Sequence, residues 1–376
     1  MTDIQILPVD GKTLLNRFIR LPERLHRGDA KYIAPLHLER LDALTPKNPF
    51  FGHADVQFWI ACRGGRDVGR ISAQIDHQAL AVRPDATGHF GMIAAEDDAE
   101  IFKALITTAA DWLRARGMKR IQGPFNLNIN EEMGLLVDGF DTPPMLLMGH
   151  DLPYVATRLE EQGFVKEKDV YAYLYDITVD LPAGARRLLD RPLPKEITVR
   201  RLDLKRYDEE VRTITDIFND AWANNWGFVP LSAIETDHLA KSLKPLLDPR
   251  LVSIVEQNGE PVGFLVCLPN LNEAIRDLGG KLFPFGVVKL LWRLKVSGLK
   301  TARVPLMGIR RKAAQGVIGK LLPFLLIDVV RKEAAKMGFT HVELSWILED
   351  NMPMRHINES LGGVAYKTYR IYEKPL

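Results

Sequence analysis

The sequence predicts an α+β fold made of two tandem halves, each a mixed β-sheet flanked by helices. Three observations lead to this prediction: a β-hairpin pattern occurs in each half, a long amphipathic helix and a strand follow each hairpin, and a second helix and strand close each half. A chain of 376 residues is long enough for two domains of ordinary size. The similarity of the halves lies in the order of their elements, because they share almost no sequence identity.

Each predicted hairpin consists of two apolar strands around a glycine turn. An Asn-Gly pair between apolar runs is among the strongest short-range hairpin signals, since both central residues of such a turn need positive φ. The strands and turns are 57–63, Gly64-Gly65 and 68–75 in the first half, and 251–255, Asn258-Gly259 and 261–267 in the second.

The helix after each hairpin is predicted from apolar residues at a spacing of 3.6. Residues 96–117 carry such a stripe and end at Gly117, while 317–336 is the corresponding helix and stops before Gly338. Glycine is common where a helix ends in the left-handed conformation. The elements expected after these helices are a strand from residue 120, a helix over 154–163 and a strand over 170–176 in the first half, and 341–348, 353–361 and 366–372 in the second.

The boundary between the halves is expected at residues 181–196. Pro182, Pro192 and Pro194 disfavour a regular helix or strand in this segment. We therefore predict an N-terminal domain over 1–180, a linker over 181–196 and a C-terminal domain over 197–376.

Composition argues against several classes of protein. The 50 Lys and Arg residues nearly balance the 48 Asp and Glu residues, and a net charge of +2 gives no general attraction to nucleic acid. Cys62 and Cys267 are too few for a disulfide scaffold or a Cys-rich zinc site, and we expect neither a metal nor a permanently bound cofactor. The chain shows no signal-peptide pattern and no window of 18 uncharged apolar residues. We therefore expect a cytoplasmic protein that is soluble or peripheral on the inner face of the cytoplasmic membrane.

A basic loop before a glycine-containing helix start lies in the second half. Arg310, Arg311 and Lys312 offer charges for phosphates, and Gly316 and Gly319 permit close approach to the backbone. Backbone amides at the start of a helix bind anions, which the helix dipole also favours. A glycine pair in a basic loop can equally be an ordinary turn.

The order of elements and this loop resemble the GNAT acyltransferase superfamily, whose members hold the pyrophosphate of coenzyme A on such a loop. The spacing departs from the family form, because Arg311-x-x-Ala314-x-Gly316 and Ala313-x-x-Gly316-x-Ile318 are both partial alignments. The segment 345–351, followed by Leu361-Gly362, also matches the family. Asn351 before Pro353 can equally be a helix cap. The resemblance implies acyl-CoA as co-substrate, bound by Ile309, Arg310, Arg311, Gln315, Gly316, Ile318, Gly319 and Asn351.

The chemistry of this superfamily needs a base that neutralises the amine and a proton for the departing thiolate. Many relatives supply the proton from a Tyr seven residues after the Asn, but position 358 is Asn in this chain. Glu349, Asp350 and His356 are the catalytic candidates. The alternatives are that the two carboxylates are solvated at a strand end and that His356 lies on a helix surface.

The first half lacks a comparable phosphate loop. Its segment 90–100 is acidic where pyrophosphate would bind, and the repulsion argues against coenzyme binding by this half. Three amides and two carboxylates follow in the segment 123–134 and suit a polar amine headgroup. An extended chain would point the three amides in one direction, although an Asn-rich loop that satisfies its own backbone is as probable. The predicted substrate-binding residues are Asn126, Asn128, Asn130, Glu131 and Glu132.

Residues 281–327 contain ten Lys or Arg and no Asp or Glu. Within the insertion 281–300 we predict an amphipathic helix over 283–300, on which Lys289, Arg293, Ser297 and Lys300 form one stripe. A basic amphipathic helix with an aromatic residue is typical of contact with an anionic membrane surface. A core-packed helix with solvated lysines is the alternative.

More specifically, the chain is similar to the bacterial acyl-CoA-dependent ceramide synthases, a GNAT-related group. The resemblance implies transfer of a fatty acyl group from acyl-CoA to the amine of a sphingoid base by direct attack on the thioester. The alternatives are an N-acetyl- or aminoacyltransferase acting on a soluble or peptide amine, and a non-catalytic sensor of lipid or acyl-CoA. The segments that carry the resemblance are 47–53, 68–71, 123–126, 345–351 and 366–374.

Overall fold

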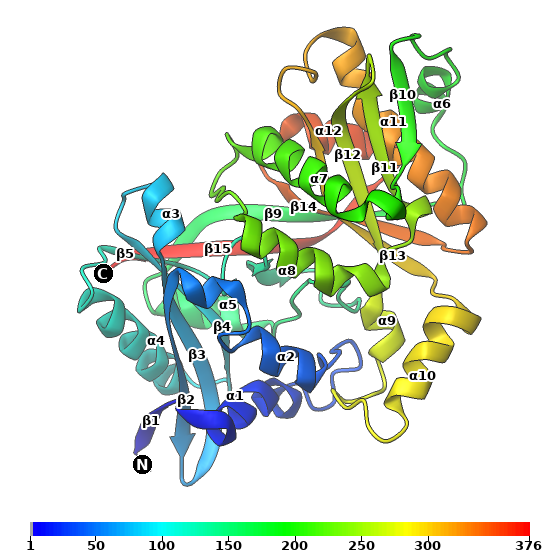
Figure 1. Ribbon diagram of the computed structural model, residues 1–376. Helices are drawn as coiled ribbons and strands as arrows, with labels where there is room; N and C mark the ends of the chain where they lie inside the picture. The colour runs from blue at the N-terminus through cyan, green and yellow to red at the C-terminus, as the bar shows by residue number, and fades with distance from the viewer. Residues whose placement is uncertain (1–2) are drawn as a thin grey trace. The chain divides into compact units, whose positions relative to one another are not determined.

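The computed structural model describes residues 3–376, which form two compact units (Figure 1). The first unit holds the residues up to Val170 together with 275–288 and 367–376, and the second holds 171–274 and 289–366. Strands β9 (Val165–Asp176) and β15 (Val364–Pro375) therefore each contribute residues to both units.

These two strands do not complete the halves to which the sequence patterns assigned them. Residues 171–176 of β9 belong to the second unit, and residues 367–375 of β15 belong to the first. There β15 pairs antiparallel with β5 (Arg120–Gly123), with Tyr372 opposite Gly123. This pairing satisfies backbone groups that β5 would otherwise expose as an edge strand.

The first unit is a mixed sheet in which only β4 and β5 are parallel neighbours. Its strand order is β1-β2-β3-β4-β5-β15. The remaining strands are β1 (Ile4–Pro8), β2 (Ala54–Arg63), β3 (Arg66–Asp76), β4 (Thr87–Ala95), β6 (Phe125–Asn126), β7 (Glu132–Met133) and β8 (Leu135–Asp138). The helices are α1 (Gly11–Leu25), α2 (His37–Ala43), α3 (His77–Val82), α4 (Ala99–Arg114) and α5 (Tyr154–Glu161), with a 3₁₀ turn at Pro49–Gly52.

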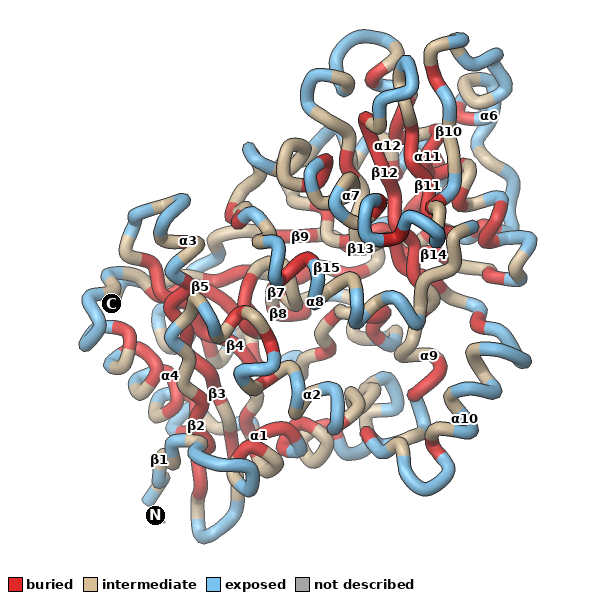
Figure 2. The backbone as a smooth tube through the Cα atoms, in the orientation of Figure 1, coloured by how far each residue is buried: buried red, intermediate tan, exposed pale blue. Residues whose placement is uncertain are grey.

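Strand β2 is buried on both faces over much of its length (Figure 2). Trp59 and Ala61 pack in the cluster that includes α4, whereas Phe58 and Ile60 pack in the cluster that includes α1. Successive side chains of a strand point to opposite faces, so a continuous apolar run fills two cores. Strand β3 gives apolar side chains to the α4 side but polar ones, beginning with Arg70, to the α1 side.

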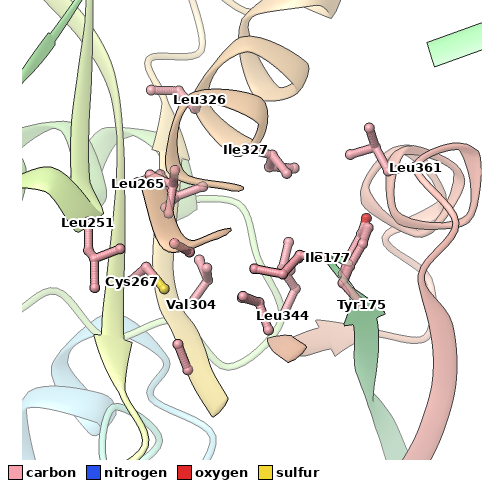
Figure 3. Packing of buried hydrophobic residues seen from close by; sticks show 14 of the residues in the cluster. Tyr175, Ile177, Leu251, Leu265, Cys267, Val304, Leu326, Ile327, Leu344 and Leu361 are labelled. Carbon is pink, nitrogen blue, oxygen red and sulfur yellow. The ribbon is translucent and has the colours of Figure 1, made fainter. Parts of the chain in front are cut away.

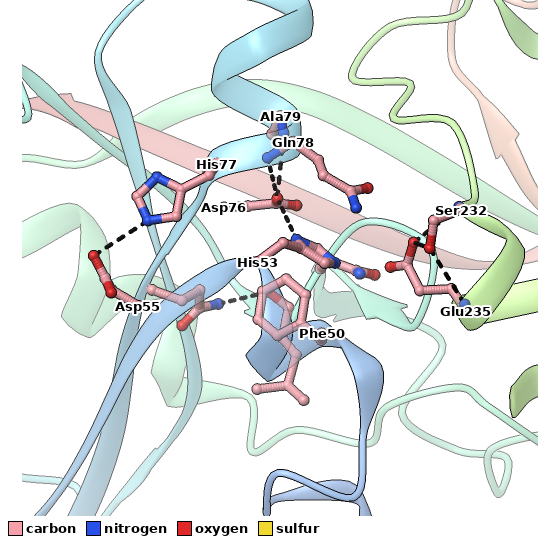
Figure 4. Close-up of polar contacts among 12 residues, drawn as sticks. Phe50, His53, Asp55, Asp76, His77, Gln78, Ala79, Ser232 and Glu235 are labelled. Carbon is pink, nitrogen blue, oxygen red and sulfur yellow. Dashed lines mark hydrogen bonds and ion pairs between the residues drawn. The ribbon is translucent and has the colours of Figure 1, made fainter.

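Side-chain caps determine where two helices begin (Figure 4). The carboxylate of Asp76 accepts the backbone N–H groups of residues 78 and 79 at the start of α3, and it also bonds the His53 ring at 3.1 Å. In the second unit, Ser232 and Glu235 form a capping box at the start of α8 (Ala233–Leu243). Such caps satisfy amide donors that the first helical turn leaves without a partner.

The second unit repeats the mixed-sheet arrangement, with β13 and β14 as its parallel pair. Its strand order is β9-β14-β13-β12-β11-β10. The strands are β10 (Ile197–Arg201), β11 (Val252–Gln257), β12 (Glu260–Pro269), β13 (Thr301–Ile309) and β14 (His341–Leu348). The helices are α6 (Ala183–Leu189), α7 (Tyr207–Trp222), α8, α11 (Gly316–Lys336) and α12 (Met352–Ser360), with 3₁₀ turns at Leu204–Arg206, Lys244–Leu246 and Pro249–Leu251.

The core of the second unit lies between its sheet and α11 (Figure 3). Leu265 of β12, Val304 of β13 and Leu344 of β14 pack with Leu326 of α11. Helix α7 packs on the sheet at β12 and β13, where a Cβ added to Gly308 would lie 3.1 Å from Ala221. Apolar residues at every other strand position therefore account for the long apolar side of α11.

Two predicted segments differ from the structure. The expected linker 181–196 contains helix α6, because Pro182 occupies the N-cap, where a proline disturbs no helical hydrogen bond. The expected helix 283–300 is shorter: α9 (Leu271–Ile275) precedes α10 (Gly286–Trp292), and a π-helical turn at Arg293–Ser297 follows α10. Gly298 then adopts a φ of 71°, so Lys300 does not continue the predicted stripe. The predicted domain boundaries stay a prediction.

Candidate active site

Strands β13 and β14 separate at the end of the sheet from which α11 begins. They pair only from Thr301 with His341 to Val304 with Leu344, and residues 305–309 of β13 extend beyond this ladder. The chain then crosses six residues before α11 starts at Gly316. The sequence prediction of a strand, a basic loop and a helix in this order is correct.

The start of α11 is suited to an anion. Its N-cap, Gln315, makes no side-chain cap hydrogen bond among the described residues, and the first turn contains no acidic residue. The unsatisfied amides and the helix dipole favour negative charge at such a position. A Cβ at Gly319 would lie 2.5 Å from the carbonyl oxygen of Ala314, so only glycine allows this close contact between loop and helix.

The two arginines of the loop contact acidic residues of α7. Arg310 lies 2.6 Å from Asp216, and Arg311 pairs with Asp220 at 3.3 Å through its side chain and at 2.8 Å through its backbone N–H. The N–H of Arg311 contributes most to lowering the pKa of Asp220. Exposed pairs of this kind contribute only about 0–1 kcal/mol, so a phosphate group can compete for both guanidinium groups.

Glu349, Asp350 and Asn351 follow directly after β14. Asn351 caps α12 by accepting the N–H of Met354 at 3.3 Å, as its position before a proline indicated. Glu349 is partly buried and its carbonyl accepts a hydrogen bond from Arg355, whereas Asp350 is exposed. His356 is exposed on α12. The structure thus gathers the first three residues at one strand end and places His356 on the helix surface.

Position 358, where many relatives have Tyr, is turned into the protein. Asn358 is fully buried, and the hydroxyl of Tyr175 donates to its carbonyl at 2.9 Å and to its side chain at 3.2 Å. Burial raises the pKa of Tyr175 far above its usual range. This position therefore has a packing role and presents no acidic hydroxyl to a leaving thiolate.

A buried polar network that the sequence analysis missed links β13, β14 and β15. Arg303 donates to Ser345 at 2.8 Å, Ser345 donates to Glu343 at 2.6 Å, and the hydroxyl of Tyr366 also bonds Glu343. Arg303 and Glu343 are opposite each other in the parallel ladder and lie 3.3 Å apart. The network is on the sheet side away from the α11 core, which the alternation of these strands with Val304 and Leu344 indicates.

The first unit has no room for a coenzyme in the corresponding place. Strands β4 and β5 pair only from Thr87 to His89, but the chain after β5 fills the separation: Asn126 accepts the backbone N–H of Met92 at 2.7 Å. A Cβ at Gly91 would lie 2.7 Å from the carbonyl carbon of Phe125. Helix α4 is capped by Asp98, which pairs with Arg63. These contacts agree with the prediction that this half lacks a phosphate loop.

The predicted substrate-binding segment is a hairpin and not an extended strand. Strand β6 ends at Asn126, which lies opposite Glu132 of β7 and donates to its carboxylate at 2.9 Å. Asn128 accepts the backbone N–H of Asn130 at 2.9 Å and so forms the turn. The expectation that the three amides point in one direction is therefore wrong, because side chains of this type bond their own backbone in turns.

Glu131 and Glu132 belong to a charged cluster on the α1 side of the first sheet. Arg40 lies 3.1 Å from Glu132, Asn48 donates to Glu131 at 3.0 Å, and Asp151 accepts the N–H of Leu136 at 2.9 Å. Sequence reasoning missed Arg40 and Asp151, which lie far away along the chain. It also missed Arg70, whose charge acts on both Glu132 and Asp151.

Burial gives the carboxylates of this charged cluster unequal acidities. It raises the pKa of Glu131 to about 7 and that of Asp151 to about 7. Burial would raise the pKa of Glu132 as well, but Arg40 and the hydrogen bond from Asn126 hold it below its usual value. One carboxylate is thus firmly ionised, while two can exchange protons near neutral pH.

No family model matches the chain. The bacterial ceramide synthase of Caulobacter vibrioides is 56% identical over 378 residues, which cover 100% of this chain and 98% of that protein. Protein YghO of Escherichia coli is 43% identical over 367 residues, covering 97% of this chain and 94% of that protein. Among solved structures, a tandem GNAT protein from the clavulanic acid biosynthesis pathway has a TM-score of 0.56 at 13% identity and covers 99% of this chain and 98% of that one. This last likeness supports the fold, and the identity along the whole chain shows the family. The chain belongs to the bacterial ceramide synthase family and is an acyltransferase with the GNAT fold.

Proposed function

We propose that the protein transfers a fatty acyl group from acyl-CoA to the amine of a sphingoid base. The observation that carries this proposal is the uncapped start of α11 beside the basic loop, in a chain that is 56% identical to a bacterial ceramide synthase. A soluble or peptide amine is the alternative acceptor, but it offers no reason for the exposed apolar segment described below.

Acyl-CoA binds, in this proposal, at the start of α11. The first amides of the helix, from Gly316 onward, hold the pyrophosphate, while Arg310 and Arg311 exchange their α7 partners for phosphate oxygens. Ile309 and Ile318 border the loop, and Gln315 and Gly319 set its shape. Asn351 lies at the strand end where the family places its coenzyme contact.

The charged cluster of the first unit binds the headgroup of the acceptor. Three carboxylates, Glu131, Glu132 and Asp151, stand against two guanidinium groups, Arg40 and Arg70, which leaves one more negative than positive group. Partly buried negative charge without an equal number of cations favours an ammonium ligand. Asn126 orients Glu132, and Asn128 and Asn130 shape the hairpin that carries both glutamates.

The reaction requires an uncharged amine. Glu349, with Asp350 as its neighbour, is the proposed base that removes a proton from the ammonium group. The nitrogen then attacks the thioester carbon, the N–C bond forms, the C–S bond breaks, and the departing thiolate takes up a proton. His356 is the proposed proton donor, since Asn358 cannot fill this role.

The segment 283–297 is the proposed membrane contact. No helix among the described residues is long and apolar enough to cross a bilayer. Phe283, Phe285 and Trp292 are nevertheless 71%, 76% and 60% exposed, and Val288, Leu291 and Val296 are exposed beside them in the sequence. A large apolar side chain that becomes fully buried contributes about 1.5–3 kcal/mol.

Charge on the same segment favours an anionic membrane surface. Lys281, Lys289 and Lys295 carry positive charge in a stretch without acidic residues, and each contributes roughly 1 kcal/mol near such a surface. Arg293 differs from the predicted stripe, because it donates to the carbonyl of Ala274 at 2.6 Å and thereby anchors the turn. Membrane binding would bring the protein to its lipid acceptor.

The proposal is tested with purified protein, a long-chain acyl-CoA and a sphingoid base, by measuring thiol release and the N-acylated product. Substitution of both Arg310 and Arg311 by Ala should raise the KM for acyl-CoA at least tenfold. Arg250→Ala, which breaks a comparable exposed pair with Asp248, should leave the KM unchanged. Equal turnover of a short soluble amine would contradict the sphingoid acceptor, and absence of thiol release with every amine would contradict an enzyme.

A further inference from the structure

Two buried histidines and an aspartate meet in the first unit outside the charged cluster. His26 follows the last residue of α1, Asp29 lies three residues later, and His150 precedes α5. The two histidines are only 6% and 9% exposed. Their separation along the chain exceeds a hundred residues, so no local motif could reveal the group.

One oxygen of Asp29 faces both imidazole rings. Oδ2 is 2.8 Å from Nε2 of His150 and 3.5 Å from Nδ1 of His26. Oδ1 accepts the backbone N–H of Lys31 at 2.8 Å, and this bond orients the carboxylate. The ring of Tyr32 stacks on His26 at 4.1 Å between centroids and limits the movement of that ring.

The two rings retain unused hydrogen-bonding capacity. Nδ1 of His26, which points toward Asp29, and Nδ1 of His150 are both buried without a hydrogen-bond partner among the described residues. A buried polar atom without a partner costs about 1–3 kcal/mol. Burial, followed by the charge of His150, lowers the pKa of His26 to about 4, which leaves a neutral ring with a lone pair at physiological pH.

We propose that His26 Nδ1, Asp29 Oδ2 and His150 Nε2 bind one divalent transition-metal ion of the zinc class. All three atoms lie within 4.8 Å of one another, and a tetrahedral zinc with bonds of about 2.0–2.1 Å places its ligand atoms roughly 3.3 Å apart. Small side-chain rotations therefore suffice to form the site. Two neutral nitrogens and one carboxylate are ligands that zinc prefers.

The ion would clamp the end of α1 to the loop that carries Asp151 of the charged cluster. Two cations act against it, because Arg70 lowers the pKa of His26 and Lys367 lowers that of His150. Three protein ligands and these charges lead us to expect weaker binding than at a closed four-ligand structural site. The inference stands on this geometry alone and does not depend on the proposed acyl transfer.

The experiment is a Zn²⁺ titration of the chelator-treated full chain, by calorimetry and by competition with a chromophoric chelator, with Co²⁺ absorption as a spectroscopic probe. We expect one ion per chain and a rise in Tm. Asp29→Asn, which keeps the shape of the side chain, and His150→Ala should each weaken binding at least tenfold. The control is His77→Ala, since His77 forms a His–Asp pair with Asp55 at 3.3 Å without a third ligand (Figure 4).

Loss of binding in both site variants, with binding retained in the His77 variant, supports the site. Absence of Zn²⁺ binding by the wild-type chain overturns it, as does unchanged binding by a folded Asp29→Asn variant. If His150→Ala does not fold by circular dichroism, Asp29→Asn decides the matter. Because these readouts measure metal and not product, they separate this inference from the proposed acyltransferase activity.

Discussion

Substitution of Gly319 by Ala tests whether the loop before α11 holds coenzyme A. The added Cβ would lie 2.5 Å from the carbonyl oxygen of Ala314, whereas ordinary contact begins at 3.4 Å. The obstacle is backbone, so the loop must move by about 1 Å to restore a normal contact, and overpacking of this kind costs about 1–3 kcal/mol. We expect the affinity for acyl-CoA, measured by calorimetry, to fall at least tenfold, which corresponds to about 1.4 kcal/mol.

The control for this variant is Gly338→Ala at the other end of α11. Gly338 has a φ of 86° with no atom near a new Cβ, so Ala there stores backbone strain of about 1–2 kcal/mol without touching the loop. Denaturant unfolding should show that both variants lose stability, while only Gly319→Ala loses coenzyme affinity. Wild-type affinity in a folded Gly319→Ala protein would refute the assignment of this loop to the pyrophosphate.

Three further predictions concern the base, the membrane and a buried acid. Glu349→Gln should lower kcat by about 10²–10⁴ and leave acyl-CoA affinity unchanged in steady-state and binding assays; near-normal turnover would assign the base elsewhere. Reversal of Lys289 and Lys295 to Glu should abolish co-sedimentation with anionic liposomes at low salt, whereas Lys103→Glu on α4 should not, and equal binding by all variants would exclude an electrostatic contact. The pKa of Glu131 is raised to about 7 from 4.5, so the native state keeps a proton between these pH values that the unfolded chain has lost, and stability falls as pH rises through this window. Glu131→Gln should therefore exceed the wild type in stability by about 1–3 kcal/mol at pH 8 and by less at pH 5; an equal difference in urea unfolding at both pH values would show that the carboxyl is not buried in this way.

Local patterns were sufficient for the elements that carry the proposed coenzyme site. The hairpin before Gly259, the helix that stops at Gly338 and the basic loop at Arg310 each depend on neighbouring residues, and the structure contains all three. The same reasoning failed for the segment after Asn126, where competition between side-chain and backbone hydrogen bonds replaced an extended strand by a turn. It also failed for the helix expected up to Lys300, because the chain must turn at Gly298 to enter β13.

The sequence by itself determined the fold class, the tandem order of elements and the family resemblance, since periodicity and motifs are read from residues close together in the chain. Only the tertiary structure decided which polar residues are buried together. Arg70 and its polar neighbours on β3 alternate with apolar residues as on a solvated face, yet that face is covered by α1 and approached by Arg40 and Glu132. The exchange of β15 into the first unit, and the meeting of His26 with His150, were likewise hidden. The physical reason is that burial and pKa depend on which distant segments pack against a residue, and no local pattern records that packing.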